Sequence, residues 1–155
     1  MSKILKIVGG LFGLVGLFMM FLPQVVVHLS TGQESLGIAA LLGGTYPKAG
    51  TGFEGVGSGL AGYILIGVGG LLLVLCALLK FFQEHDVINY ITVGLAIICL
   101  IVGIIMIFLI RKGFADVNGF NNDEIYVGVG AMIGGSLGAL GIAFGGFGLI
   151  LDFAK

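Results

Sequence analysis

Residues 87–110 read VINYITVGLAIICLIVGIIMIFLI, and this stretch decides the class of the fold. It contains no Asp, Glu, Lys, Arg or His. A helix needs about 20 apolar residues to cross a bilayer core of roughly 30 Å. Residues 97–109 lack the alternation of polar and apolar side chains that a membrane-spanning strand shows. Because lipid offers no partner to backbone N–H and C=O groups, we predict that the stretch is a transmembrane helix.

Three more stretches are comparably long and apolar. They lie between the titratable pairs Lys6 and His28, Glu54 and Lys80, and Glu124 and Asp152. The predicted transmembrane helices cover 4–27, 59–82, 87–110 and 126–150, and a long loop covers 28–58. We predict a single transmembrane domain over residues 1–155, all-α in class, in which four antiparallel helices form a bundle.

The composition agrees with this fold class and excludes several others. Only 10% of the 155 residues are charged and 58% are hydrophobic, whereas an average globular protein has about 25% charged residues. The mean hydropathy is +1.19. A soluble enzyme needs more polar surface. A net charge of −1 without a basic run argues against nucleic-acid binding.

The lysines indicate how the chain is oriented in the membrane. Lys3 and Lys6 lie at the start of the first predicted helix, and no cation lies close to its other end. Positive charges near the first helix tend to stay on the cytoplasmic side. We therefore expect a multi-pass protein of the cell (plasma) membrane with both termini in the cytoplasm, where Lys80 and Lys155 also lie. The outer side then carries Lys48 and the two cations at 111–112, so the cations divide four to three, and the pair at the outer end of the third helix is a local exception.

The loop of residues 28–58 is the longest and has a composition of its own. A β-branched run at 25–30 follows Pro23 and suggests that an extended strand leaves the first helix. Residues 36–42 are apolar but too short to span a bilayer, and residues 51–57 read as turns or a second strand. We expect this loop to form a small outer cap, with short β-strands as one option.

Glycine is concentrated in the last predicted helix, where two rows of small residues follow the helical period. The first row is Gly130, Gly134, Gly138, Gly141, Gly145 and Gly148, and the second is Gly128, Ala131, Gly135, Ala139 and Gly146. Small residues let helices approach closely in lipid, where no hydrophobic force drives their association. The rows are therefore predicted to pack the chain's own bundle. A row that the bundle leaves free is predicted to be the seam of a homo-oligomer.

Chemically active residues are scarce in the predicted spans. Within the spans, away from their ends, the sequence holds no Asp, Glu, Lys, Arg or His. Ionisable residues within a membrane mark proton, ion or substrate paths. Their absence argues against ion-coupled transport and against a rotor subunit of a rotary ATPase. His28 and His85 are expected on opposite sides of the membrane, where they cannot share a metal ion. We predict no catalytic, cofactor-binding or metal-binding residue and no enzymatic activity.

In layout the chain resembles the claudin-like tetraspan proteins and the small four-helix membrane proteins of bacteria and archaea. The resemblance rests on a first helix that ends near Leu22-Pro23, a long first outer loop, a tight inner hairpin at 83–86 and a last helix rich in small residues. The Trp and paired Cys residues that true claudins carry in the first outer loop are absent. The resemblance therefore implies an architecture and no defined activity.

These observations lead to one functional hypothesis and two alternatives. The first is a non-enzymatic membrane scaffold that acts through the last helix and the first outer loop, by self-association or by binding another membrane or envelope protein. Membrane lipids are also expected contacts, and nucleic acid is not. The alternatives are a passive oligomeric pore, lined by the glycine rows with Thr92 or Ser136, and an accessory or immunity-type subunit of a larger membrane complex.

Overall fold

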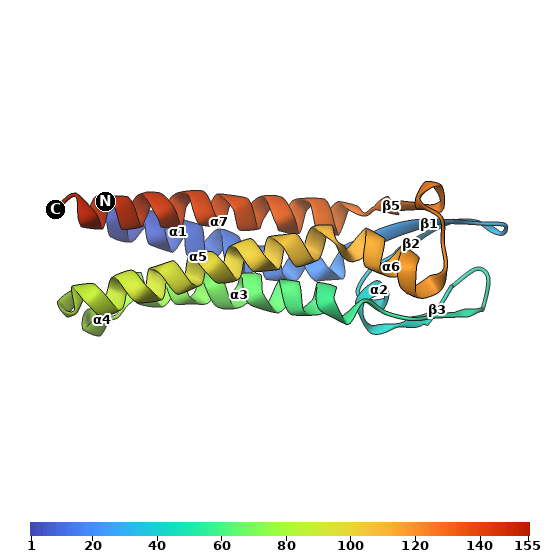
Figure 1. Cartoon of the computed structure of the whole chain (residues 1–155), viewed down its shortest axis with the longest axis horizontal. Coiled ribbons are helices and arrows are strands. Elements are labelled where there is room, and N and C mark those ends of the chain that lie inside the picture. Colours follow the sequence, from blue (N-terminus) through green and yellow to red (C-terminus); the bar gives the residue numbers. More distant parts are fainter.

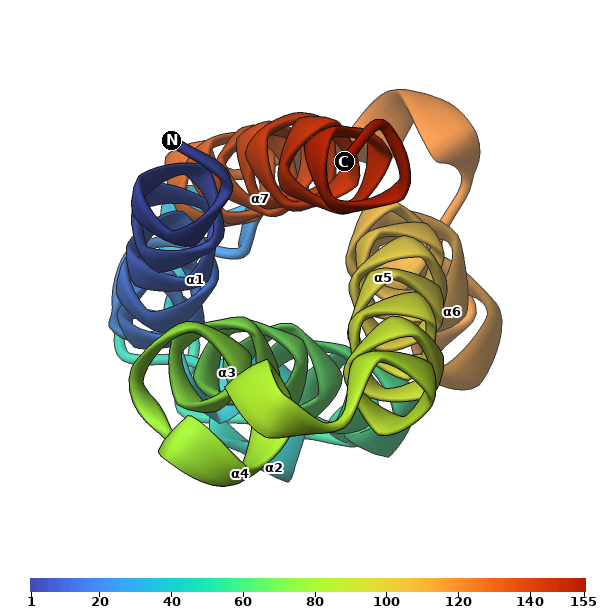
Figure 2. The same cartoon turned by 90° about the vertical axis from the view of Figure 1, so that its left-hand side faces the viewer.

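Four long helices dominate the structure, a computed structural model that describes all 155 residues. They are α1 (Ser2–Phe18, continued by the 3₁₀ turn η1, Met19–Phe21), α3 (Gly57–Leu78), α5 (Asp86–Phe108) and α7 (Val129–Phe153). All four are long and apolar enough to cross a membrane, which confirms that part of the prediction. They lie side by side with alternating direction (Figure 1). Each contacts two neighbours, in the cyclic order α1, α3, α5, α7 (Figure 2).

Two predicted helix ends are wrong at the end of the bundle that lies away from the termini. The first helical segment ends at Phe21 rather than near residue 27. Leu22 is extended (φ −79°, ψ 164°), as expected of a residue that precedes proline. The last helix begins at Val129 rather than near residue 126, and Tyr126 belongs to a strand.

At the opposite end, which holds both termini, the first and last helices extend over residues that the sequence pattern predicts to lie at or beyond the helix ends. α1 begins at Ser2 and α7 continues to Phe153, so that Lys6 and Asp152 both lie within helices. The short helix α4 (Lys80–Glu84) connects α3 to α5. We call this the terminal end of the bundle and the other the cap end (Figure 1).

The centre of the cap is a three-stranded antiparallel sheet. Its strands are β1 (Val25–Leu29), β2 (Gly32–Leu36) and β5 (Ile125–Val127), in the order β2-β1-β5. Val25 pairs with Leu36 of β2 and with Val127 of β5. The expectation that the first loop alone forms the cap is therefore wrong, because β5 comes from the segment between α5 and α7.

Short elements complete the cap. The first loop adds α2 (Ala39–Leu42), β3 (Gly44–Thr45) and β4 (Gly52–Phe53), and the second adds α6 (Ile110–Asn118) and η2 (Asn122–Glu124). The apolar run at 36–42 lies in the core of the cap, where Leu36, Ala40 and Leu41 are buried. Aromatic rings pack in the same core with neighbouring centroids 4.8 to 6.4 Å apart: Tyr46, Phe53, Phe114 and Phe120.

Glycines bring the backbones of neighbouring helices into contact in the bundle. A Cβ added at Gly103 of α5 would lie 2.7 Å from the carbonyl oxygen of Gly62 in α3. Between the helices, Ile66, Leu73 and Leu100 are fully buried in the core. The interior of the bundle is thus packed with side chains.

Candidate functional site

The terminal end of the bundle holds a polar cavity of about 350 Å³, to which all four long helices contribute. Its buried polar lining consists of Ser2, Lys6, Asn89 and, largely buried, Asp152. Exposed charged residues surround its mouth: Lys3, Asp86 and Lys155. These residues come from the first turns of α1 and α5 and from the last turn of α7 and the residues after it.

A buried ion pair joins α1 to α7 in this cavity. Nζ of Lys6 contacts Oδ2 of Asp152, and the two side chains are only 3% and 13% exposed. Removing charges from water is costly, and a buried ion pair needs good geometry and further hydrogen bonds to compensate. Gly148 provides the space, since a Cβ there would lie 2.9 Å from Cγ of Lys6. The last glycine of the first row thereby lets the stem of Lys6 lie against α7.

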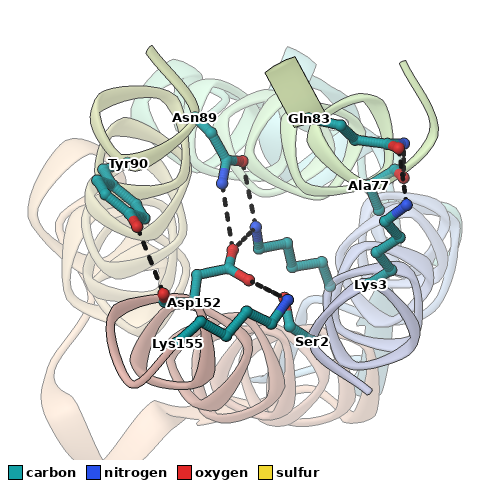
Figure 3. Close-up of polar contacts among 9 residues, drawn as sticks. Ser2, Lys3, Ala77, Gln83, Asn89, Tyr90, Asp152 and Lys155 are labelled. Carbon is teal, nitrogen blue, oxygen red and sulfur yellow. Dashed lines mark hydrogen bonds and ion pairs between the residues drawn. The ribbon is translucent and has the colours of Figure 1, made fainter. Parts of the chain in front are cut away.

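Asp152 accepts hydrogen bonds from several helices (Figure 3). Oγ of Ser2 donates to Oδ1, and Nδ2 of Asn89 donates to Oδ2 at 3.1 Å. Nζ of Lys155 lies 3.5 Å from Oδ1. Nζ of Lys6 also donates to Oδ1 of Asn89 at 3.1 Å, so Lys6, Asn89 and Asp152 contact one another. Charge-assisted hydrogen bonds are stronger than neutral ones, and these hold the ends of α1, α5 and α7 together.

Further polar contacts connect the rim of the cavity (Figure 3). Nζ of Lys3 donates to Oε1 of Gln83 at 2.7 Å, and Nε2 of Gln83 donates to the carbonyl oxygen of Ala77 at 3.0 Å. On the other side, the Tyr90 hydroxyl donates to the carbonyl oxygen of Asp152 at 3.4 Å. The rim therefore ties α1 to α4 and α5 to α7.

The structure corrects the expectation that the long helices lack ionisable groups in their interiors. Lys6 and Asp152 belong to α1 and α7, and their side chains are turned into the bundle. Sequence reasoning treats them as charges that flank the spans. One signal points to their pairing: opposite charges near the ends of two helices whose predicted topology puts both termini on one side.

The first glycine row of α7 lies inside the chain. A Cβ at Gly141 would lie 3.0 Å from the carbonyl oxygen of Gly9 in α1, and one at Gly138 would lie 2.8 Å from Cγ1 of Ile104 in α5. All six members are buried: Gly130, Gly134, Gly138, Gly141, Gly145 and Gly148. This row therefore packs the chain's own bundle.

The second row divides into two parts. Gly128, Ala131 and Gly135 are buried, and a Cβ at Gly135 would lie 2.8 Å from Cε2 of Phe108. Ala139 is exposed. Gly146, the last member of this row, is half-buried, and a Cβ there would have nothing within 4 Å. Because Gly128, Ala131 and Gly135 are buried within the chain, the seam predicted for a second copy is reduced to the surface around Ala139 and Gly146.

The packing of the glycine rows also bears on the predicted pore, because the residues expected to line it make contacts within the chain. The hydroxyls of Thr92 and Ser136 each donate to a carbonyl of their own helix, at Ile88 and Met132 respectively, over 2.8 Å. The first glycine row and most of the second face the chain's own residues. They therefore do not line a path between copies.

A second group of buried polar side chains lies at the cap end. The Tyr63 hydroxyl donates to Oε1 of Gln24 at 2.6 Å. Nε2 of Gln24 donates to the carbonyl oxygens of Met19 and Leu22 at 2.8 and 2.7 Å. Gln24 thus adds a partner to the Met19 carbonyl, which also accepts from the backbone N–H of Leu22, and provides one for the Leu22 carbonyl at the end of η1.

Glu34 and Tyr46 are buried polar residues of the cap whose hydrogen bonding is incomplete. Oε1 of Glu34 accepts from the backbone N–H groups of Lys48 at 2.7 Å and Ala49 at 3.3 Å. Its Oε2 and the Tyr46 hydroxyl have no partner. Burial, and then the charge of Glu34, raise the pKa of Tyr46 above its ordinary value of 10.0. By accepting hydrogen bonds from Lys48 and Ala49, Glu34 holds the loop of residues 46–50 against β2.

Comparison with protein-family models, curated proteins and solved structures finds no match to the chain. The claudin-like layout therefore stays a prediction from topology. No group of three or more His, Cys, Asp and Glu side chains is placed to hold a metal ion. Two features are left from which function can be inferred: the cap and the polar cavity at the terminal end.

Proposed function

We propose that the chain is a non-enzymatic, multi-pass protein of the cell membrane whose cap binds another protein of the membrane or envelope. The observation that carries the proposal is a folded cap with an exposed, uncharged sheet face, mounted on four helices that are long and apolar enough to cross a membrane. Both termini lie at the other end with Lys3, Lys80 and Lys155. The tendency of lysine to stay in the cytoplasm then places the cap outside.

The outer sheet face consists of Val26, His28, Gln33, Ser35 and Tyr126, which alternate with buried residues along the strands. Val26 pairs with both Ser35 and Tyr126, and His28 pairs with Gln33. The rings of His28 and Tyr126 meet edge to face with centroids 5.1 Å apart. Protein interfaces are enriched in Tyr and depleted of charged residues at their centre. The composition of this face suits such an interface.

A cationic side chain donates to a carbonyl on each edge strand of the same sheet. Beside β2, Nζ of Lys48 donates to the carbonyl oxygen of Gln33 at 3.0 Å. Beside β5, Nε of Arg111 donates to the carbonyl oxygen of Ile125 at 2.8 Å. Cationic side chains on an edge strand disfavour extension of the sheet by a strand of a second copy. Together with the internal packing of the glycine rows, this favours a different protein over self-association.

Site-specific photocrosslinking in intact cells tests the proposal. Tyr126, which is 52% exposed on the outer sheet face, is replaced by p-benzoyl-phenylalanine, and Phe81, which is 53% exposed at the terminal end, is replaced in a control. We expect one adduct of defined mass from position 126, which mass spectrometry identifies as a membrane or envelope protein. His28→Ala is expected to reduce its yield, because His28 packs against Tyr126.

The control decides whether capture is specific to the cap. The same adduct from position 81 would indicate random encounter in the membrane and would contradict the proposal. Adducts at twice the mass of the chain alone would show self-association and would also contradict it. Deleting residues 36–42 is a poor test, since Leu36, Ala40 and Leu41 are core residues and their loss would unfold the cap.

A further inference from the structure

We infer that the polar cavity at the terminal end binds a phosphate group with an ammonium group near it, as in the headgroup of an aminophospholipid. This site lies at the opposite end of the molecule from the outer sheet face. The inference uses the membrane orientation proposed above but does not depend on any partner of the cap.

The ammonium group of Lys6 provides the first argument. An ammonium has three N–H donors, and the acceptors of Lys6 are Oδ2 of Asp152 and Oδ1 of Asn89. One donor is left, on a side chain that is 3% exposed and lines the cavity. In the cavity this donor is available to a ligand. An oxygen-rich group that enters the cavity would satisfy it.

The charges around the mouth provide the second argument. Lys6 compensates the charge of Asp152, which Lys155 also contacts at 3.5 Å. In charge, Lys3 and Lys155 are then balanced only by Asp86 among the residues of the lining. Asp86 forms no ion pair, since both ion pairs of the chain involve Asp152. Two cations and one separate anion complement a ligand that carries a phosphate and an ammonium group. A simple anion would leave Asp86 facing its charge.

The position of the cavity provides the third argument. Its buried residues lie in the first turns of α1 and α5 and the last turns of α3 and α7, where the apolar helices end. In the proposed orientation this is the level of the cytoplasmic headgroups, where basic pockets between transmembrane helices bind phospholipid headgroups. A volume of about 350 Å³ is sufficient for a small polar ligand.

The test measures retention of lipid by the full chain in detergent, by native mass spectrometry. Phosphatidylethanolamine is the main probe, and phosphatidylglycerol, which has no ammonium group, is compared with it. The double variant Lys3→Gln/Lys155→Gln removes the cations at the mouth and leaves the buried pair of Lys6 and Asp152 intact. We expect it to bind phosphatidylethanolamine about tenfold more weakly, or worse. Lys80→Gln, an exposed lysine at the same end that does not line the cavity, is expected to bind like the wild type.

Three results would overturn the inference. The first is wild-type affinity in the double variant, and the second is an equal loss in Lys80→Gln, which would indicate a general effect of charge. The third is binding of phosphatidylglycerol at least as tight as that of phosphatidylethanolamine. Asp86→Asn supplies the converse test: it should weaken phosphatidylethanolamine binding and strengthen phosphatidylglycerol binding.

A soluble probe distinguishes the two sources of this chemistry. O-phosphoethanolamine carries the same two groups without acyl chains. Displacement of the lipid by O-phosphoethanolamine at similar concentration would assign the site to a soluble phosphorylated amine, and a strong preference for the lipid would assign it to the bilayer. Thermal unfolding of each variant, compared with the wild type, shows whether a loss of binding reflects a loss of fold.

Discussion

At the scale of single residues, two buried tyrosines differ in whether the hydroxyl has a partner. Tyr63 donates to Gln24 at 2.6 Å, whereas the Tyr46 hydroxyl has none. Tyr63→Phe leaves Oε1 of Gln24 buried without a donor, which we expect to cost about 1–3 kcal/mol of unfolding free energy. Tyr46→Phe removes no hydrogen bond and relieves a buried hydroxyl without a partner, so it is expected to raise the unfolding free energy by up to about 1–3 kcal/mol. Detergent-titrated unfolding, monitored by circular dichroism, measures both.

The two variants control for each other because both delete one buried oxygen from a tyrosine ring. Equal losses of stability would show that the contact between Tyr63 and Gln24 carries no special weight. A third variant, Gln24→Leu combined with Tyr63→Phe, removes donor and acceptor together. It should recover part of the loss from this pair, although the carbonyl oxygen of Leu22 then loses its partner and that of Met19 keeps only the backbone N–H of Leu22.

Sequence reasoning predicts the positions of these residues better than their contacts. Tyr63 lies near the end of a long helix, as the apolar pattern indicates, but its partner Gln24 lies across the first loop. The same holds for Lys6 and Asp152, which are far apart in the sequence and meet only when α1 and α7 pack. A hydrogen bond of this kind depends on the relative rotation of two helices, which hydropathy does not determine.

At the scale of elements, two glycines of α5 differ in whether the backbone of a neighbouring helix lies against them. A Cβ at Gly103 would lie 2.7 Å from the carbonyl oxygen of Gly62, while nothing lies within 4 Å of a Cβ at Gly94. We expect Gly103→Ala to push α5 away from α3 and to cost about 1–3 kcal/mol. Gly94→Ala is expected to be neutral or to stabilise by up to about 1 kcal/mol, as alanine favours the helix. The midpoint of unfolding in denaturing detergent compares the two.

A loss at Gly94 as large as that at Gly103 would mean that both helix positions depend on glycine for another reason. The contact at Gly103 is to backbone, which cannot rotate out of the way as a side chain can. The expected difference between the two variants is therefore a direct measure of how closely α3 and α5 approach.

Elements differ in how well the sequence predicts them. The four long helices follow from local apolar composition alone, because each satisfies its own backbone hydrogen bonds. The strand β5 has three residues and no pattern of its own, and it forms because Val25 and Val27 of β1 offer an edge to it. The cap therefore contains a segment that no local signal assigns to it.

At the scale of the whole molecule, the packing of the cap explains why a cation, Arg111, lies on the side of the membrane where positive charge is disfavoured. Arg111 belongs to α6 in the cap, on the side that we propose to be outside. Its guanidinium donates to the carbonyl oxygens of Ile125 and Asn122 at 2.8 and 2.6 Å. This cation thus has a structural role in the cap, and it weighs less against the proposed orientation than an unattached lysine would.

That orientation predicts which surfaces an impermeant thiol reagent reaches in intact cells. In a chain with Cys76→Ala and Cys99→Ala, we introduce Ser35→Cys on the outer sheet face or Lys155→Cys at the exposed C-terminus. The cysteine at position 35 should react with a membrane-impermeant maleimide in intact cells. The cysteine at position 155 should react only after permeabilisation, because both termini lie at the lysine-rich end. The reverse pattern would invert the topology and would move the cap, with its sheet face, into the cytoplasm.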